Sequence, residues 1–443
     1  MLSETRCQEI FETIQRASSA DETEVFLAAS ESTLTRFANN IIHQNVAEEG
    51  IDVSVRALVE GRTARASTNK TDAAALGRVA EQAVTSARWQ PRDPDLLPLP
   101  EPQSYRSLDR YCELTAQLTP QARAQAVKKV VERADRNHLT AAGVFSNGSL
   151  TQALLNSRGL FAYHRETKAE FSVTYLDGGS GWAKGNFTRA SQLDVEKLAA
   201  RACQKALKSR EPKEIPPGRY TVILEPAAVL DLVGFLFYDF AGTAVLDQRS
   251  CFTQQIGKKV FGDNISIWDD VYHPLQAGAP WDGEGMARGA VQLVDRGVLN
   301  NLVYARHTAK RMNTDATGHG LLLPNEWGEA PLNLVFAGGT TSLEAMIRAT
   351  DRGVLVTRLW YIREVDPYEK ILTGMTRDGT FYVEAGKIQH PIRNLRFNQS
   401  LKEMLNQVEV LGPAVRAAGE ESFEMVVPAM RVANFHFTEV TKY

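Results

Sequence analysis

The chain has 443 residues, of which 43% are hydrophobic and 23% are charged, and its formal net charge at pH 7 is -3. This composition predicts a folded protein with two or more domains, because one hydrophobic core seldom grows to this length. The small acidic excess and the lack of a Lys- and Arg-rich stretch exclude the usual surface for nucleic acid. The first residues, MLSETRCQEIFETIQ, contain no continuous apolar run, so we expect a cytoplasmic protein without signal peptide or membrane anchor.

The first half of the chain passes twice through a helix, several strands and a second helix. Amphipathic spacing predicts helices at residues 3–17, 72–88, 120–137 and 194–209. Strands are predicted at residues 24–29, 40–45, 51–59, 140–146, 152–157, 159–175 and 181–187. A linker-like, proline-rich segment lies among them at residues 91–103. This order favours an α+β domain at residues 1–212, with helices flanking a largely antiparallel sheet.

A second proline-rich stretch, EPKEIPPG, precedes a β-rich domain expected at residues 218–443. Strands are predicted there at residues 220–224, 265–268, 289–295, 297–304, 332–337, 353–362, 379–384 and 386–392. Short helices are predicted at residues 342–351 and 401–407. A longer apolar helix, PAAVLDLVGFLFYDF at residues 226–240, is expected to be buried on nearly all sides.

Motifs for the familiar catalytic chemistries are missing from the sequence. The chain has eight histidines, and no two of them are spaced to hold a metal from one helical face. No GxSxG elbow and no Walker A motif occurs, and no GxGxxG motif opens a helix. These observations argue against an ordinary zinc protease, a serine hydrolase and a nucleotide-binding enzyme.

Three segments carry polar groups beyond what a scaffold needs. Asp282 and Glu284 lie in a glycine-bracketed loop, WDGEG, where paired carboxylates can ligate a hard cation or accept from backbone amides; an exposed turn is the alternative. His319 stands between glycines in TGHG, where it either lines a cleft or satisfies buried carbonyls. Arg36 and Asn39 belong to RFANN, which also fits a turn with a left-handed Asn.

Several segments, taken in chain order, resemble the TldD/PmbA family, once called modulators of DNA gyrase. The similar segments are TRFANNIIHQN, GRTARASTN, NSRGL, PWDGEGM, RGVLNNLVYARHTAKRMN, ATGHGLLLPNEW and FYVEAGKIQHPI. The DGEG and ATGH segments resemble the PmbA (TldE) branch more than the TldD branch. The resemblance implies a two-domain subunit with a barrel-like C-terminal domain, which pairs with a TldD-type subunit in a cytoplasmic metallopeptidase.

In the family, TldD-type subunits carry an HExxxH zinc motif on a helix of the second domain and a cysteine ligand near the C-terminus. Neither feature transfers to this chain. The two histidine positions fall near Val233 and Tyr238, and the glutamate position falls near Gly234. Residues 165–272 contain no histidine, and residues 412–424 contain no cysteine. The resemblance therefore implies a non-catalytic subunit without a metal ligand of its own, and zinc in a TldD-type partner.

Such a subunit would form a wall of the chamber in which an extended peptide is bound as an added strand, held by main-chain hydrogen bonds. The peptide would be an unfolded polypeptide or a leader peptide. The residues expected to face the chamber or the partner are Asp282, Glu284, His319, Arg358, Arg36 and Asn39.

Other functions stay open. The chain could be a non-enzymatic binding or regulatory protein, acting as a homodimer in a role related to DNA gyrase, or a metallopeptidase with an unrecognised metal site. A homodimer in the absence of the partner is open as well. Neither nucleic acid nor a membrane is expected as a binding partner.

Overall fold

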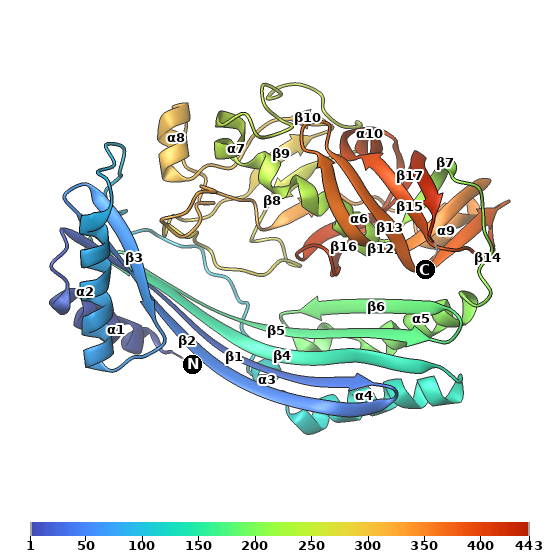
Figure 1. The fold of residues 1–443 in the computed structure, drawn as a ribbon, viewed down its shortest axis with the longest axis horizontal. Coiled ribbons are helices and arrows are strands. Elements are labelled where there is room, and N and C mark those ends of the chain that lie inside the picture. The colour runs from blue at the N-terminus through green and yellow to red at the C-terminus, as the bar shows by residue number, and fades with distance from the viewer. Residues whose placement is uncertain (1, 442–443) are drawn as a thin grey trace.

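A computed structural model describes residues 2–441 and contains two β-sheets with flanking helices. The first sheet has six strands and ends at residue 187, and the second has eleven strands and begins at residue 218. In Figure 1 the long strands of the first sheet run beneath the second sheet. This architecture confirms the predicted α+β class. Within residues 2–441, no helix is long and apolar enough to cross a membrane.

The first sheet is antiparallel throughout, in the order β3-β2-β1-β4-β5-β6. Its strands are β1 (Glu22–Ala38), β2 (Ile41–Val59), β3 (Arg62–Thr68), β4 (Thr140–Asn156), β5 (Phe161–Leu176) and β6 (Ser180–Phe187). The strands predicted at 40–45 and 51–59 are one strand of 19 residues. Residues 46–50 stay paired in register with β1. The polar, exposed residues among them therefore do not interrupt the strand.

Four long helices cover one face of this sheet. They are α1 (Glu4–Ala17), α2 (Ala73–Trp89), α4 (Pro120–Arg136) and α5 (Val195–Lys208), and the short elements are α3 (Glu113–Ala116) and the 3-10 helix η1 (Ala190–Gln192). Each long helix begins after a side-chain cap that accepts from a backbone N–H, at Ser3, Asp72, Thr119 and Asp194.

Side chains alternate between the two faces of a strand, so the odd positions of β1 share one face. Val25 and Leu27 are buried with α1 and α2, and Phe37 is buried with α4 and α5. In Figure 1 α4 lies below the sheet and the second sheet lies above it. The even positions of β1 are therefore left to face the second sheet.

The linker-like segment, residues 91–103, lies within a longer stretch, residues 90–109, that has no helix or strand. It is nevertheless packed against the protein. Leu99 is buried, and its backbone N–H donates to the Glu22 carboxylate over 2.7 Å. Arg106, three residues after the segment, stacks over the Tyr272 ring at 4.5 Å, so the longer stretch also contacts the C-terminal half.

The second sheet is mixed, with β17 at its centre. Its strands are β7 (Gly218–Leu224), β8 (Ile267–Asp269), β9 (Val291–Asp295), β10 (Val298–Leu299), β11 (Leu334–Phe336), β12 (Arg352–Asp366), β13 (Ile371–Glu384), β14 (Lys387–Pro391), β15 (Leu395–Ser400), β16 (Val408–Ala417) and β17 (Met425–Val440). Its helices are α6 (Pro226–Val233), η2 (Gly234–Phe240), α7 (Gly242–Leu246), α8 (Arg306–Met312), α9 (Leu343–Arg348) and α10 (Leu401–Asn406).

Five of these strands close into a ring. The pairing runs from β17 through β15, β13, β12 and β7, and β7 pairs again with β17. Only the pairing of β7 with β12 is parallel within this ring. This closed ring gives the C-terminal part of the chain its barrel-like form. Closure also removes the exposed edges of those strands.

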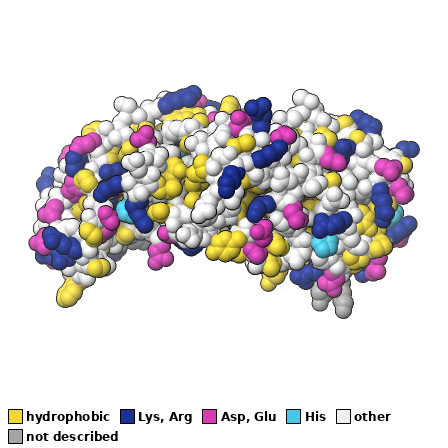
Figure 2. Space-filling model, turned by 90° about the horizontal axis from the view of Figure 1, so that it is seen from above, with side chains coloured by type: hydrophobic (Ala, Val, Ile, Leu, Met, Phe, Trp, Pro, Cys, Tyr) yellow, Lys and Arg dark blue, Asp and Glu magenta, His cyan; other side chains and the backbone are white. Residues whose placement is uncertain are grey.

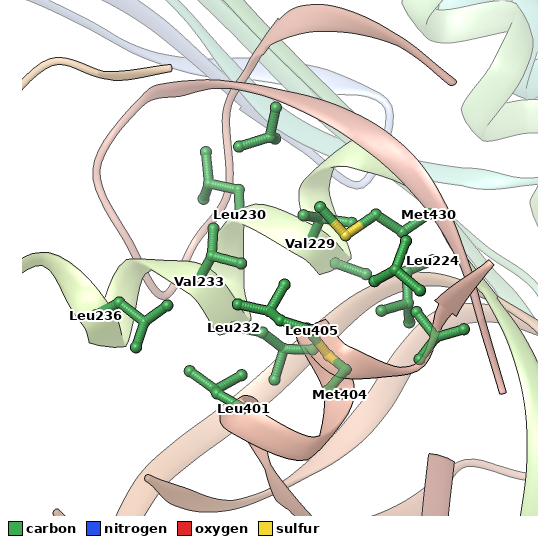
Figure 3. Close-up of a cluster of buried hydrophobic side chains, with 14 of the residues drawn as sticks. Leu224, Val229, Leu230, Leu232, Val233, Leu236, Leu401, Met404, Leu405 and Met430 are labelled. Carbon is green, nitrogen blue, oxygen red and sulfur yellow. The ribbon is translucent and has the colours of Figure 1, made fainter. Parts of the chain in front are cut away.

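The apolar helix predicted at residues 226–240 is not a single α-helix. It is α-helical as α6 up to Val233 and continues as the 3-10 helix η2 from Gly234. Figure 3 shows the α6 side chains among Leu224 of β7, Met430 of β17 and the leucines of α10. Burial on nearly all sides holds for α6 but is wrong for η2, where Phe235 and Phe237 are only partly buried. The tighter 3-10 turn rotates those two aromatic rings out of the core.

Candidate functional site

A cleft lies between the first sheet and the loops of the second. One wall is the sheet face opposite the helices, where Phe26 of β1, Gln152 of β4 and Glu166 of β5 line a cavity of about 460 Å³. Loops at residues 276–283 and 319–322 form the other wall. Glu166 joins the two walls, because its carboxylate accepts from the backbone N–H of Gly278 over 2.7 Å.

Further polar contacts join the loops of the second sheet to the first half of the chain. The Tyr105 hydroxyl donates to the Gly285 carbonyl over 2.7 Å, and Arg65 Nε donates to the Leu323 carbonyl over 2.6 Å. The same Arg65 pairs with the buried carboxylate of Glu24 at 2.5 Å. The loops of the second sheet are therefore bonded directly to β3 and to the segment before α3.

Asp282 organises the WDGEG loop through its carboxylate. Oδ1 accepts from the backbone N–H groups of Glu284 and Met286, both over 2.9 Å, and Oδ2 accepts from that of Gly320 over 2.7 Å. The residue is 7% exposed, and burial raises the pKa of this carboxyl despite those hydrogen bonds. The alternative of an exposed turn is wrong here, and the predicted role of catching backbone amides is confirmed.

Glu284 is the second buried carboxylate of this loop. Its Oε2 accepts from the backbone N–H of Arg306 at the start of α8 over 2.9 Å, and the residue is 3% exposed. Burial and the neighbouring Asp282 raise the pKa of Glu284 to about 7. It also lines a separate cavity of about 300 Å³ between β2, the linker-like segment and α8.

His319 lines the cleft and is held in place by both ring nitrogens. Nε2 lies 2.8 Å from Oδ1 of Asp269, and Nδ1 lies 3.0 Å from the Thr317 hydroxyl. Arg288 donates to the same Asp269 oxygen over 2.9 Å. Burial alone would raise the pKa of Asp269, but the charges of His319 and Arg288 outweigh it and lower this pKa. The histidine ring therefore bonds to side chains of a polar network, and not to the buried carbonyls of a turn.

Asp269 and Glu329 belong to this site and were not predicted. Glu329 is fully buried and accepts from the backbone N–H groups of Thr243 over 2.6 Å and Ala305 over 3.1 Å, and from the Thr308 hydroxyl over 2.9 Å. It joins the starts of α7 and α8 to the loop before β11. Asp269 directly follows the strand predicted at residues 265–268, which is the one signal that could have found it.

Arg358 lies apart from these residues. Its guanidinium pairs with Asp378 at 2.5 Å and stacks between Trp182 of β6 and Trp360 of β12, at 5.0 and 5.3 Å from the ring centres. It is 5% exposed and lines none of the cavities described here. Its place is the junction of the two sheets, away from Asp282 and His319.

Arg36 and Asn39 lie at the far tip of the β1–β2 hairpin. Arg36 donates to the Gln44 side chain over 3.2 Å. Asn39 and Asn40 have φ of 50° and 62°, as in a two-residue hairpin turn. The left-handed Asn turn is confirmed, and Asn40 fixes it by accepting from the backbone N–H of Ala141 over 2.7 Å.

The positions that align with the family's zinc motif offer no donor set for zinc. Val233 is fully buried in the apolar core. A Cβ on Gly234 would collide with the Ser422 hydroxyl. The Tyr238 ring packs edge-on against Trp327 at 4.8 Å, and its hydroxyl accepts from Arg249 over 3.1 Å. Zinc needs histidine, cysteine or carboxylate ligands converging on one point, and these residues do not fit it.

An open groove lies beside η2 at these positions. We call it the aromatic groove, a cavity of about 610 Å³ whose rings are Phe235, Phe237, Tyr238, Trp327 and Phe423. More widely, no group of three or more His, Cys, Asp and Glu side chains within residues 2–441 could hold a metal ion. The cleft is thus lined by polar and charged groups as well as apolar ones, and the groove largely by aromatic rings.

Three models of metallopeptidase domains match the chain in succession, which defines its class. Residues 23–87 match PmbA/TldA metallopeptidase domain 1, residues 108–210 match the central domain, and residues 217–439 match the C-terminal domain. The protein belongs to the PmbA/TldD family, as the resemblance predicted.

Individual relatives agree with this assignment. The chain is 23% identical over 398 residues to the metalloprotease PmbA of Escherichia coli O157:H7, covering 84% of each chain. It is 27% identical over 309 residues to the metalloprotease TldD homolog of Buchnera aphidicola subsp. Schizaphis graminum, covering 64% of this chain and 62% of the relative. Its fold matches the crystal structure of TldE from Thermococcus kodakarensis with a TM-score of 0.90 and 20% identity, over 98% of this chain and 100% of that one.

Proposed function

We propose that this protein is a PmbA/TldE-type, non-catalytic subunit of a cytoplasmic heteromeric metallopeptidase that degrades unfolded polypeptides or trims leader peptides. The zinc is held by a TldD-type catalytic partner, and this chain supplies a wall of the peptide-binding chamber. The observation that carries the proposal is the α6–η2 segment. Where a zinc helix would present histidines, Val233 is buried in the core and Tyr238 is packed on Trp327.

The partner is proposed from exposed apolar residues on β12 and in the turn after it, and from the family assignment. Tyr361 is 55% exposed and Tyr368 is 56% exposed. Large aromatic residues of this kind are enriched at the centre of protein interfaces. On the face shown in Figure 2, basic and acidic side chains intermingle, so that face offers no basic stripe for nucleic acid.

We propose two domains, residues 1–212 and 218–443, with the linker-like segment 91–103 inside the first. The cleft would then lie between domains, where ligand sites are common. Asp282, Glu284 and His319 would act by holding the two cleft loops in one geometry, because their polar atoms bond to backbone and side chains of this chain. Arg358 would hold the second domain against β6, and Arg36 and Asn39 would face the partner from the hairpin tip.

The test is a peptidase assay of this chain alone, of its TldD-type partner alone and of the two mixed, with the metal content of each measured by mass spectrometry. We expect zinc in the partner, none at stoichiometric level in this chain, and more peptidase activity in the mixture than in the partner alone. Stoichiometric zinc in the isolated chain, or a mixture no more active than the partner, would contradict the proposal. Size-exclusion chromatography of the chain alone shows whether it forms a homodimer without the partner.

A further inference from the structure

We propose that the aromatic groove is a binding site for an extended peptide, which it holds by one large apolar side chain with a basic residue next to it. This proposal rests on the proposed function only in that the complex acts on peptides. The site itself is defined by residues of this chain and can be tested without a partner.

The rings of the groove form two contacting pairs. Phe237 and Phe423 meet edge to face with ring centres 5.6 Å apart, and Tyr238 and Trp327 meet edge to face at 4.8 Å. The ring of Phe237 lies 6.3 Å from that of Tyr238 and links the pairs. The rings therefore support one another in fixed positions, so a bound side chain would find a preformed apolar surface.

The backbone keeps this surface open. The 3-10 geometry of η2 leaves Phe235 and Phe237 partly buried at the groove. Gly234 lets the loop that carries Ser422 and Phe423 pack directly on η2, because any side chain at Gly234 would strike Ser422. Two elements distant in sequence are thus fixed on opposite sides of one cavity.

The charges around the groove favour a cationic ligand. Lys370 is neutralised by Asp239 at 2.5 Å and Glu364 at 2.6 Å. Glu420 lines the groove with only a long ion pair, to Lys184 at 3.8 Å. Glu421 lies 3.9 Å from Arg363 and accepts from the backbone N–H groups of Tyr361 over 2.9 Å and Ile362 over 3.2 Å. The remaining cation, Arg249, is already paired with Asp247 at 2.9 Å. Carboxylates are therefore in excess, and a Lys or Arg beside the inserted apolar residue would balance them.

The size of the groove favours a peptide over a folded partner as its occupant. Its volume of about 610 Å³ lies within the range of sites that enclose a few side chains. In an extended segment the side chains next to an inserted apolar residue point away from the groove. A flanking Lys or Arg is long enough to bend its charged end back to the carboxylates at the rim. A docking segment of the partner subunit is the alternative that the experiment must separate.

The experiment measures fluorescence anisotropy of three labelled pentapeptides with the isolated chain: Gly-Arg-Phe-Arg-Gly, Gly-Glu-Phe-Glu-Gly and Gly-Arg-Ala-Arg-Gly. We expect the first to bind about tenfold or more tightly than either of the others. Trp327→Ala should weaken its binding by about tenfold, whereas Trp89→Ala, which removes an 83% exposed tryptophan at the end of α2, should leave it unchanged.

A second pair of variants guards against a folding defect in the first. Phe423→Ala should weaken the same peptide, and Glu420→Gln should reduce the preference for basic over acidic peptides without removing binding. Equal binding of all three peptides, or equal effects of Trp327→Ala and Trp89→Ala, would overturn the proposal. So would a Trp327→Ala variant that binds the peptide normally but no longer assembles with the TldD-type partner, because the groove would then be a subunit interface. None of these outcomes depends on where the zinc lies.

Discussion

Replacing Glu284 by Gln should change how the stability of the protein depends on pH. The pKa of this carboxyl is raised from its usual 4.5 to about 7 in the folded protein, mainly by burial. A raised pKa means that the stabilising contribution is complete below pH 4.5 and is lost as the pH rises through 7, because the folded state must then carry a buried charge. The difference corresponds to about 3 kcal/mol of unfolding free energy at most.

Glu284→Gln removes that charge and keeps an oxygen that can accept from the backbone N–H of Arg306. We therefore expect the variant and the wild type to be equally stable at pH 4, and the variant to be more stable by up to about 3 kcal/mol at pH 8. The assay is urea unfolding followed by circular dichroism at pH 4, 6 and 8. Glu12→Gln, at an exposed position of α1, is the matched control and should change nothing. If the wild type and Glu284→Gln lost the same unfolding free energy between pH 5 and 8, the reasoning would be refuted.

Three further predictions concern the cleft loops, the junction of the two sheets and the β1–β2 turn. Gly320→Ala should destabilise the protein by about 1–3 kcal/mol, because a Cβ there meets a buried carboxylate, whereas Gly77→Ala in open space on α2 should stabilise it by about 0.5–1 kcal/mol; thermal unfolding of both checks the pair. Arg358→Met should cost about 3 kcal/mol by leaving Asp378 charged and buried, and adding Asp378→Asn should recover much of that loss in a double-mutant cycle. Asn40→Ala should cost about 2 kcal/mol in urea unfolding, because it removes the turn's hydrogen bonds and the side chain suited to φ of 62°.

Local patterns predicted the first sheet well, because its strands alternate between a helix-covered face and a more open one. They failed in the second sheet. Its strands are hydrogen-bonded to neighbours on both sides, so they form even where polar and apolar residues alternate only weakly. β13 was predicted only at residues 379–384, although it begins at Ile371, because the preceding LTGMTRD combines glycine with charged residues. Conversely, the strand predicted at 297–304 shrinks to Val298–Leu299, since Asn300 and Asn301 both donate from their backbone N–H groups to Leu293.

The site was predictable only where glycines marked it. Asp282 and His319 stand in glycine-bracketed loops, and the backbone of Gly320 does approach the Asp282 carboxylate closely. Asp269 and Glu329 are not bracketed by glycines, although Glu329 follows Gly328. Their partners lie 19 to 86 residues away along the chain. Only the folded chain brings those groups together.

The closed ring of the second sheet also sets an order of events during synthesis. β7 begins at Gly218, but the strand that closes the ring beside it, β17, begins at Met425. At ribosomal rates of about 5–20 residues per second, β7 waits on the order of ten seconds or more for that partner. The first sheet is complete by residue 187 and can form in the meantime. Newly made β7 and α6 would thus expose their apolar residues to the cell during this interval, when a chaperone could hold them.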